Sequence, residues 1–268
     1  MLNSNVEKLS FESFEKYGKI HNDFLTNVKQ NFEPTDEISS YDEAIDYVNT
    51  FQQQFLKSTS LSESEKQMLS AAIIETKRFV DFDYSYNKMF PNQENRQKSA
   101  SIDEMTLFEL VEKSKEDGLI DEFEYNSLMA LGEKVKLSYE GVISDFELKS
   151  FTLQLKDEWL AMGYTVDSEN GRIMAYTLAI SLASLEWWEE NPDGLKSSRS
   201  LKSALALPAW AAADIGGAIV SGAIAASGQY TLTGEVNWEV VGWSALGGGV
   251  STSTGAAGKV GKWISSMF

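Results

Sequence analysis

The last quarter of the chain, residues 195–268, differs in composition from everything before it. This tail holds 12 of the 19 glycines and 4 of the 7 tryptophans. It carries five basic and three acidic residues, a net +2, so the −17 of the whole chain leaves −19 on residues 1–194. Glycine costs up to about 1 kcal/mol per position in a helix. Helices this rich in glycine therefore need close packing contacts that offset this loss of stability.

Small residues recur every four positions along both apolar stretches of the tail, 203–227 and 238–264. These ladders consist of Ala213, Gly217, Ser221 and Ala225 in the first stretch, and of Gly247, Ser251 and Gly255 in the second, with Gly248, Thr252 and Ala256 beside them. Because residues four apart share a helix face, small side chains there let two backbones approach closely. We expect two helices joined by Gly228–Gly234 and associated through these residues, as an antiparallel hairpin or between subunits.

The first 194 residues predict a set of amphipathic helices. Capping boxes, in which Ser, Thr or Asp stands three residues before Glu, mark helix starts at Ser40, Ser62, Asp121 and Ser144. The same pattern at Thr106 is either a further start or a coincidence. Apolar residues at steps of three and four predict the following helices: 6–31, 41–57, 63–86, 104–116, 122–138, 145–162 and 169–190. No sustained alternation indicates a strand. The expected fold is all-α, a multi-helix bundle with a C-terminal Gly/Ala-rich helical hairpin.

The organisation follows from the change in composition. We expect an acidic helical body over 1–194 and a hairpin domain over 195–268, with a Gly- and Pro-containing linker near 191–200. Within the body, residues 117–124 and 140–147 repeat one helix–turn–helix pattern. This pattern is similar to the second half of a calcium-binding loop. A calcium loop needs carboxylates at its first two ligand positions. These positions are Lys113 and Lys115 in the first copy and Lys136 and Ser138 in the second, and helix capping alone accounts for the residues that match.

Several classes of function are disfavoured by composition. Without cysteine the chain has no thiolate nucleophile, disulfide or thiolate metal site. An isoelectric point near 4.5 argues against nucleic-acid binding. We expect the single histidine, His21, to be solvated on a helix. No catalytic, cofactor-binding or metal-ligating residue is assigned and no cofactor is expected; a carbohydrate hydrolase, suggested by the acids beside Trp187–Trp188, is a remote alternative.

The tail also has features of a membrane-interacting segment. The first apolar stretch has 25 residues, about 37 Å as a helix, which is enough to span a bilayer. Tryptophan and lysine near the segment ends could contact lipid or a partner. These candidate contact residues are Trp210, Trp238, Trp243, Trp263, Lys202, Lys259 and Lys262. Asp214, inside the first stretch, opposes constitutive insertion.

The Gly/Ala-rich segments Ala211–Ala218 and Gly247–Gly249 resemble those of bacteriocins and glycine-zipper membrane proteins. The layout, an acidic helical body followed by an apolar C-terminal hairpin, is similar to that of pore-forming colicins, whose hairpins contain more bulky apolar residues. The resemblance implies a secreted antibacterial protein that permeabilises a membrane. A secreted or cell-surface location, with a leader removed, is therefore slightly favoured over a cytoplasmic one.

Two functional hypotheses follow. In the first, the protein is non-enzymatic and its hairpin engages a membrane surface or assembles with further copies. In the second, the protein is a soluble structural or protein-interaction module whose hairpin is part of the core. A hairpin enclosed by the body favours the second hypothesis, and one displayed on the surface favours the first.

Overall fold

The computed structural model describes residues 7–31, 41–75, 105–192 and 207–266, with side chains at all of these except 41–49, 74–75, 207–209 and 253–266. The described helices are α1 (Glu12–Asn31), α2 (Tyr41–Ser58), α3 (Glu63–Glu75), α5 (Leu107–Glu116), α6 (Glu122–Tyr139), α7 (Asp145–Met162), α8 (Arg172–Glu190), α9 (Leu207–Thr233) and α10 (Trp238–Ser266). Across these ranges there is no strand, only an isolated bridge between Lys8 and Thr165. The predicted all-α fold is confirmed.

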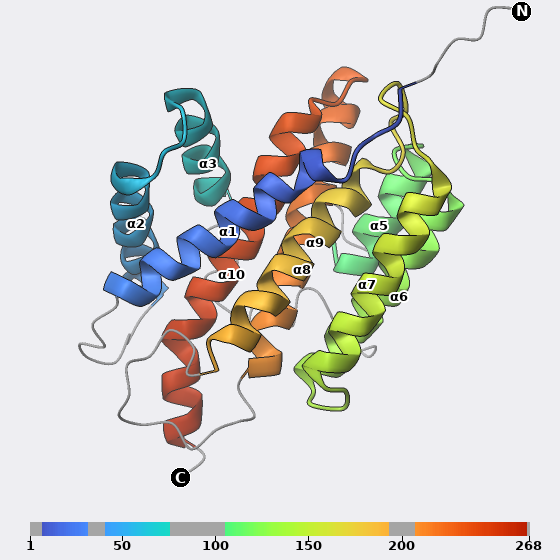
Figure 1. Ribbon diagram of the computed structural model, residues 1–268. Coiled ribbons are helices and arrows are strands. Elements are labelled where there is room, and N and C mark those ends of the chain that lie inside the picture. The colour runs from blue at the N-terminus through green and yellow to red at the C-terminus, as the bar shows by residue number, and fades with distance from the viewer. Residues whose placement is uncertain (1–6, 32–40, 76–104, 193–206, 267–268) are drawn as a thin grey trace, which may run out of the picture.

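The two tail helices, α9 and α10, run antiparallel through the middle of the bundle (Figure 1). α9 packs against α5, α6 and α8, and α10 packs against α1, α2, α3 and α8. The pair α2–α3 thus lies on one side of this central layer, and α5–α7 lies on the other. α7 is peripheral, because its main contacts are with α6 and α8.

Helix starts follow the capping boxes read from the sequence. Boxes with both reciprocal hydrogen bonds occur at Ser62–Glu65, Thr106–Glu109, Asp121–Glu124 and Ser144–Glu147. In the duplicated pattern, the two glycines that precede the new helices have φ of 75° and 71°, the left-handed conformation that glycine adopts without strain. The box expected at Ser40 lies outside the described residues, as do residues 193–200 of the linker and the boundary between residues 194 and 195.

Four predicted boundaries are wrong. The helices expected from residues 104 and 169 begin three residues later, at Leu107 and Arg172. The first helix begins at Glu12, not at residue 6, because residues 7–9 are extended beside the α7–α8 loop: the Leu9 amide donates to the Tyr164 carbonyl at 2.8 Å. The expected turn at Gly228–Gly234 is helical as far as Thr233. α9 ends instead where Gly234 has a φ of 75°.

Glycine sets the spacing between α9 and α10. A Cβ atom on Gly217 would lie 2.5 Å from the Gly248 carbonyl oxygen, and one on Gly248 would lie 2.2 Å from the Gly217 oxygen. No real Cβ fits at such distances, so the two backbones touch. Gly247 faces away from α9, and its Cβ would lie 2.9 Å from Cβ of Ala72 in α3. α10 therefore has close backbone contacts on more than one face.

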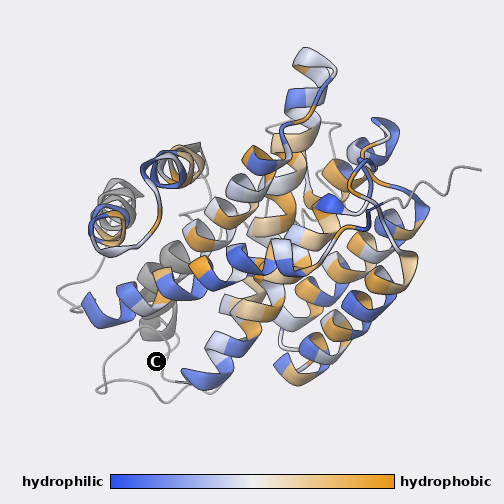
Figure 2. Ribbon diagram, turned by 45° about the horizontal axis from the view of Figure 1, so that its top comes forward, coloured by the Kyte–Doolittle hydropathy of each residue, from blue (hydrophilic) through white to orange (hydrophobic). Residues whose placement is uncertain are grey.

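The apolar content is concentrated in the central layer. Figure 2 shows α8, α9 and the described part of α10 mainly in white and orange, whereas the outer helices show blue on their solvent sides. α8 is buried on most sides from Ile173 to Trp188, as its composition predicts. The outer helices are thus a polar shell around helices that have no polar face of their own.

Replacing Gly248 with alanine is expected to lower the free energy of unfolding by about 1–3 kcal/mol, because the added methyl group would force α9 and α10 apart. Gly222→Ala is the matched control: its Cβ would meet only Cβ of Ala245, at 3.4 Å. This control should leave stability unchanged or raise it by up to about 1 kcal/mol, since alanine is the better helix former. Urea denaturation followed by circular dichroism measures both variants, and equal stabilities would contradict the close approach.

Candidate functional site

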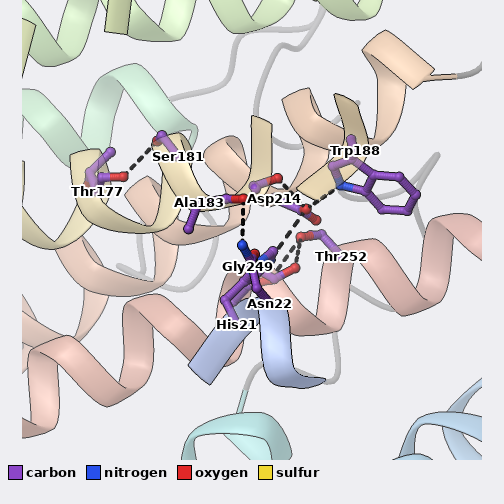
Figure 3. A network of polar contacts seen from close by, with 11 residues as sticks. His21, Asn22, Thr177, Ser181, Ala183, Trp188, Asp214, Gly249 and Thr252 are labelled. Carbon is purple, nitrogen blue, oxygen red and sulfur yellow. Dashed lines mark hydrogen bonds and ion pairs between the residues drawn. The ribbon is translucent and has the colours of Figure 1, made fainter. Parts of the chain in front are cut away.

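A buried polar cluster surrounds Asp214, the acidic residue within apolar α9 (Figure 3). Its carboxylate is 0% exposed. Two side chains from α8 donate to its Oδ2 atom: the Ser184 hydroxyl at 2.6 Å and the Trp188 indole N–H at 2.9 Å. A buried carboxylate is costly unless it is hydrogen-bonded or paired, and α8 supplies the bonds here.

The third neighbour of this carboxylate is His21, from α1. Its Nε2 atom lies 3.3 Å from Oδ2 of Asp214, and both side chains are 0% exposed. Nδ1 of His21 faces Oδ1 of Asn22 at 3.1 Å, and the Asn22 amide nitrogen donates to the Ala183 carbonyl at 2.9 Å. The Asn22 oxygen thus faces one ring nitrogen of His21, and the Asp214 carboxylate faces the other.

Glycines bring the helices close enough to form this cluster. A Cβ on Gly18 would lie 2.4 Å from the Ala179 carbonyl oxygen, so α1 approaches α8 closely one turn before His21. A Cβ on Gly249 of α10 would lie 3.3 Å from the carbonyl oxygen of Asp214 and 3.5 Å from the imidazole ring of His21. Four helices therefore meet around one carboxylate.

The expectation that His21 is solvated is wrong. Its position explains the burial: His21 follows Phe14 and Tyr17 at helical spacing and precedes Phe24, and all three of these aromatic residues are buried. A histidine on the apolar face of an amphipathic helix was therefore a readable signal of burial. Its partner was not readable, since α1 and α9 are far apart in the chain.

The cluster contains serine, histidine and aspartate, but it is not arranged for nucleophilic catalysis. In a catalytic triad the serine donates to the histidine, whereas Ser184 donates to Asp214. All three side chains are 0% exposed. Across the described residues, no three His, Asp or Glu side chains lie together in a way that could hold a metal ion. The arrangement ties α1 and α8 to α9.

A second buried acid, Glu124, lies at the opposite edge of α8. It closes the capping box of α6, and its side chain is 0% exposed. Burial raises the pKa of Glu124 to about 8, partly offset by the backbone N–H groups of Gly171 and Met174 at the start of α8. Gly171, the N-cap of α8, has no side chain to cap that helix. Glu124 closes the capping box of α6 through Oε2, and its buried Oε1 atom, near the start of α8, makes no hydrogen bond of normal geometry.

The predicted helix-association residues fall into three groups. Gly217 and Ser221 face α10, where they meet Gly248 and Thr252 rather than Gly247. Of the remaining described ladder residues, Ala213 and Ser251 are buried, and Ala225 is partly buried. The side chain at position 255 is outside the described part of α10. The second ladder that faces α9 is thus the one that begins at Gly248.

Of the three predicted membrane or partner contacts whose side chains are described, two are buried inside the protein. Trp210 is 2% exposed against Trp188, with ring centroids 4.5 Å apart, and Trp243 is 1% exposed beside Tyr17. Trp238 is half-buried, and its indole N–H donates to Glu169 at 2.6 Å. Lys202 and the side chains of Lys259, Lys262 and Trp263 lie outside the described residues. In this fold, Trp210 and Trp243 could reach lipid only if the bundle opened.

Asp214→Ala is expected to destabilise the protein by about 1–3 kcal/mol for each buried donor left unsatisfied, because Ser184 and Trp188 both lose their acceptor. Asp214→Asn, which retains an acceptor oxygen, should lose less. The control is Glu235→Ala, an exposed acid in the α9–α10 turn, which should stay within about 0.5 kcal/mol of the parent. Thermal and urea unfolding measure these differences; equal stability of the alanine variants at 214 and 235 would refute the role of the cluster.

Glu124→Gln should change how stability depends on pH. The pKa of Glu124 is about 8 in the folded protein and 4.5 as the ordinary value, so between these pH values the folded state holds a proton that unfolding releases. The free energy of unfolding should therefore fall as pH rises through this range. Glutamine has no charge to bury, so the variant should lose this slope and exceed the parent in stability above pH 8.

Glu147→Gln is the matched control, because Glu147 closes the equivalent capping box of α7. It is exposed, and hydrogen bonds from the Ser144 backbone and side chain lower its pKa. Its contribution is present above the ordinary pKa and is lost as pH falls, opposite in sign to that of Glu124. Urea unfolding between pH 4 and 9 distinguishes the two variants, and identical slopes would contradict the assignment.

The chain matches no protein-family model, no curated protein and no solved structure. Its function must therefore be argued from its own geometry: an apolar helix pair enclosed by amphipathic helices, and a buried carboxylate that ties the pair to α1 and α8.

Proposed function

We propose that this protein is a non-enzymatic helical interaction module in which the Gly/Ala-rich tail forms the permanent core. One observation carries the proposal. Among the described residues, one helix is long and apolar enough to cross a membrane, Trp210–Thr233 of α9, and 83% of its apolar window is buried inside the protein. The surrounding helices bury the apolar side chains of this helix, so it needs no lipid to cover them.

The way in which the core is attached supports the same proposal. α9 is joined to α8 by the hydrogen bonds of Asp214 and to α5 by a contact between the hydroxyls of Ser227 and Ser114, 3.2 Å apart. Buried polar contacts of this kind fix one register between helices, because a shift would leave each group unpaired. A helix held at two points by directional bonds is suited to a permanent place in the fold.

A second candidate function is conditional insertion of the tail into a membrane. The stretch Trp210–Thr233 has 24 residues, about 36 Å as a helix, and so is long enough to span. The backbone contact between Gly217 and Gly248 is also a type of packing that persists in lipid, because it rests on close van der Waals contact rather than on exclusion of water. Insertion would first have to withdraw Asp214 from its partners on α1 and α8.

Dye release from vesicles tests the choice between these functions. We expect the intact protein to release no dye from vesicles of phosphatidylcholine with or without phosphatidylglycerol, since its spanning-length helix is enclosed. Melittin is a positive control for vesicle integrity. Release by the intact protein at concentrations where it remains folded would count against the proposal.

A covalent lock identifies which part of the molecule causes any release. The chain has no cysteine, so the double variant Ser114→Cys/Ser227→Cys places one disulfide between α5 and α9, at hydroxyls now 3.2 Å apart. If the reduced variant releases dye and the oxidised variant does not, the second candidate replaces the first. Release by both forms would assign the activity to the outer surface and remove the tail from both accounts.

A further inference from the structure

The outer face of α7 carries an apolar stripe on the surface of the bundle. Phe146 is 76% exposed, Leu153 is 46% exposed and Leu160 is 48% exposed. They are seven residues apart, so they lie along one face of the helix, with polar residues at the positions between them on that face. The inner face of the same helix is formed by Leu148, Leu155 and Trp159, among others, and is buried. α7 is therefore apolar on two faces, one of which points to solvent.

The duplicated helix–turn–helix pattern shows that this exposure is not a general property of the motif. In the first copy, Leu119 is 2% exposed and Phe123 is partly buried against the core. The equivalent residues of the second copy are Val142, at 65%, and Phe146, at 76%. One motif thus presents to solvent the side chains that its copy buries. Large apolar side chains that line up on a surface commonly mark an interface.

We propose that this face of α7 is a homodimer interface, in which two copies of the chain pair their α7 helices antiparallel about Leu153. The proposal goes beyond the interaction module proposed above, because it uses no residue of the tail. Two-fold symmetry requires a surface that is complementary to itself. The order of residues on this face meets that requirement.

The exposed face alternates apolar and polar residues in the order Phe146, Ser150, Leu153, Asp157, Leu160. With Leu153 on the two-fold axis, each Phe146 faces the Leu160 of the other copy. Each Ser150 faces an Asp157, and its hydroxyl can donate to that carboxylate. A parallel pair would instead place the two Asp157 carboxylates against each other, and like charges that face each other are destabilising. The polar residues therefore select the antiparallel arrangement.

The basic residues beside the stripe do not oppose this pairing. Antiparallel helices bring the Lys149 of one copy near the Lys156 of the other. Each lysine is already paired within its own chain, Lys149 with Glu189 and Lys156 with Glu15, the latter at 3.1 Å. The repulsion that remains is between two chains of net charge −17. Salt screens repulsion between exposed charges, so the dimer should become tighter as ionic strength rises.

Sedimentation equilibrium over a range of protein concentrations tests the interface. We expect a reversible monomer–dimer equilibrium, with at least tenfold weaker association for Leu153→Asp, which places two carboxylates on the axis. Leu232→Asp is the matched control: Leu232, near the end of α9, is 85% exposed and should leave association unchanged. A mass of one chain at every concentration and salt level would overturn the proposal.

Single cysteines determine the direction of pairing. Leu153→Cys should give a disulfide-linked dimer under mild oxidation, because the two positions meet on the axis. Phe146→Cys should not, since two copies of position 146 would lie about 21 Å apart along the helices and a disulfide needs Cα atoms within about 7 Å. Leu232→Cys measures random collision. Crosslinking at position 146 as fast as at position 153, or at 153 no faster than at 232, would contradict the antiparallel pair.

Substitutions at Ser150 test the dimer contact separately from the stability of the monomer. Ser150→Lys should tighten the dimer several-fold and Ser150→Glu should weaken it by a similar factor, because position 150 faces Asp157 of the other copy. Residue 150 is exposed in the monomer, so neither change should shift the unfolding midpoint at a concentration where the protein is monomeric. Equal association of the two variants would exclude the Ser150–Asp157 contact.

Discussion

Backbone contact between two glycine-rich helices determines the rest of this structure. At Gly217 and Gly248 neither helix has room for a side chain, so α9 and α10 form a pair thinner than two ordinary helices. The same thinness lets other elements approach α10: Gly242 lies against Tyr17 and Tyr176, where a Cβ would be 2.6 Å and 2.5 Å from their rings. Amphipathic helices can therefore close around a pair that has no polar face of its own. The glycines give up helix propensity and gain packing in return.

The polar cluster follows from this central position. An acid placed on α9 has no route to water, so Asp214 must find its partners among the enclosing helices, and Ser184, Trp188 and His21 supply them. Such a cluster adds little net stability compared with apolar packing. Its effect is on register, because α1, α8 and α9 can satisfy the buried groups in only one relative position. Gly/Ala surfaces have few large side chains to interlock, and the cluster therefore explains why these helices pack in a single register.

The proposed dimer surface lies on α7, not on the tail that dominates the sequence. The tail is the most unusual part of the chain, yet its described residues are mostly interior. The solvent-facing apolar residues lie instead on α7, a helix of ordinary composition. Composition identifies segments that must be buried, whereas an interface depends on which apolar side chains remain uncovered once the fold has formed. Only the packed structure separates Phe146, at 76% exposure, from the equivalent Phe123.

The sequence by itself determined which segments are helical and where several of the helices begin. Capping boxes at Thr106, Asp121 and Ser144 mark starts that the structure confirms, because a cap is a contact between residues three positions apart. The apolar character of α8 and its central place were also readable, since a helix that is apolar on most sides must be buried. The end of α9 was not, because Gly228 continues the helix and the left-handed conformation that ends it occurs only at Gly234.

Tertiary structure decided the pairing of residues distant in the chain. The ladders of small residues predicted close approach, but the sequence does not distinguish Gly247 from its neighbour Gly248. Only the packing shows that Gly248 contacts α9 and Gly247 contacts α3. His21 and Asp214 are separated by most of the chain, and no local pattern joins them. The physical reason is the range of the interactions: capping and periodicity act within one or two helical turns, whereas facing residues, buried pairs and uncovered surfaces depend on how whole helices are placed against each other.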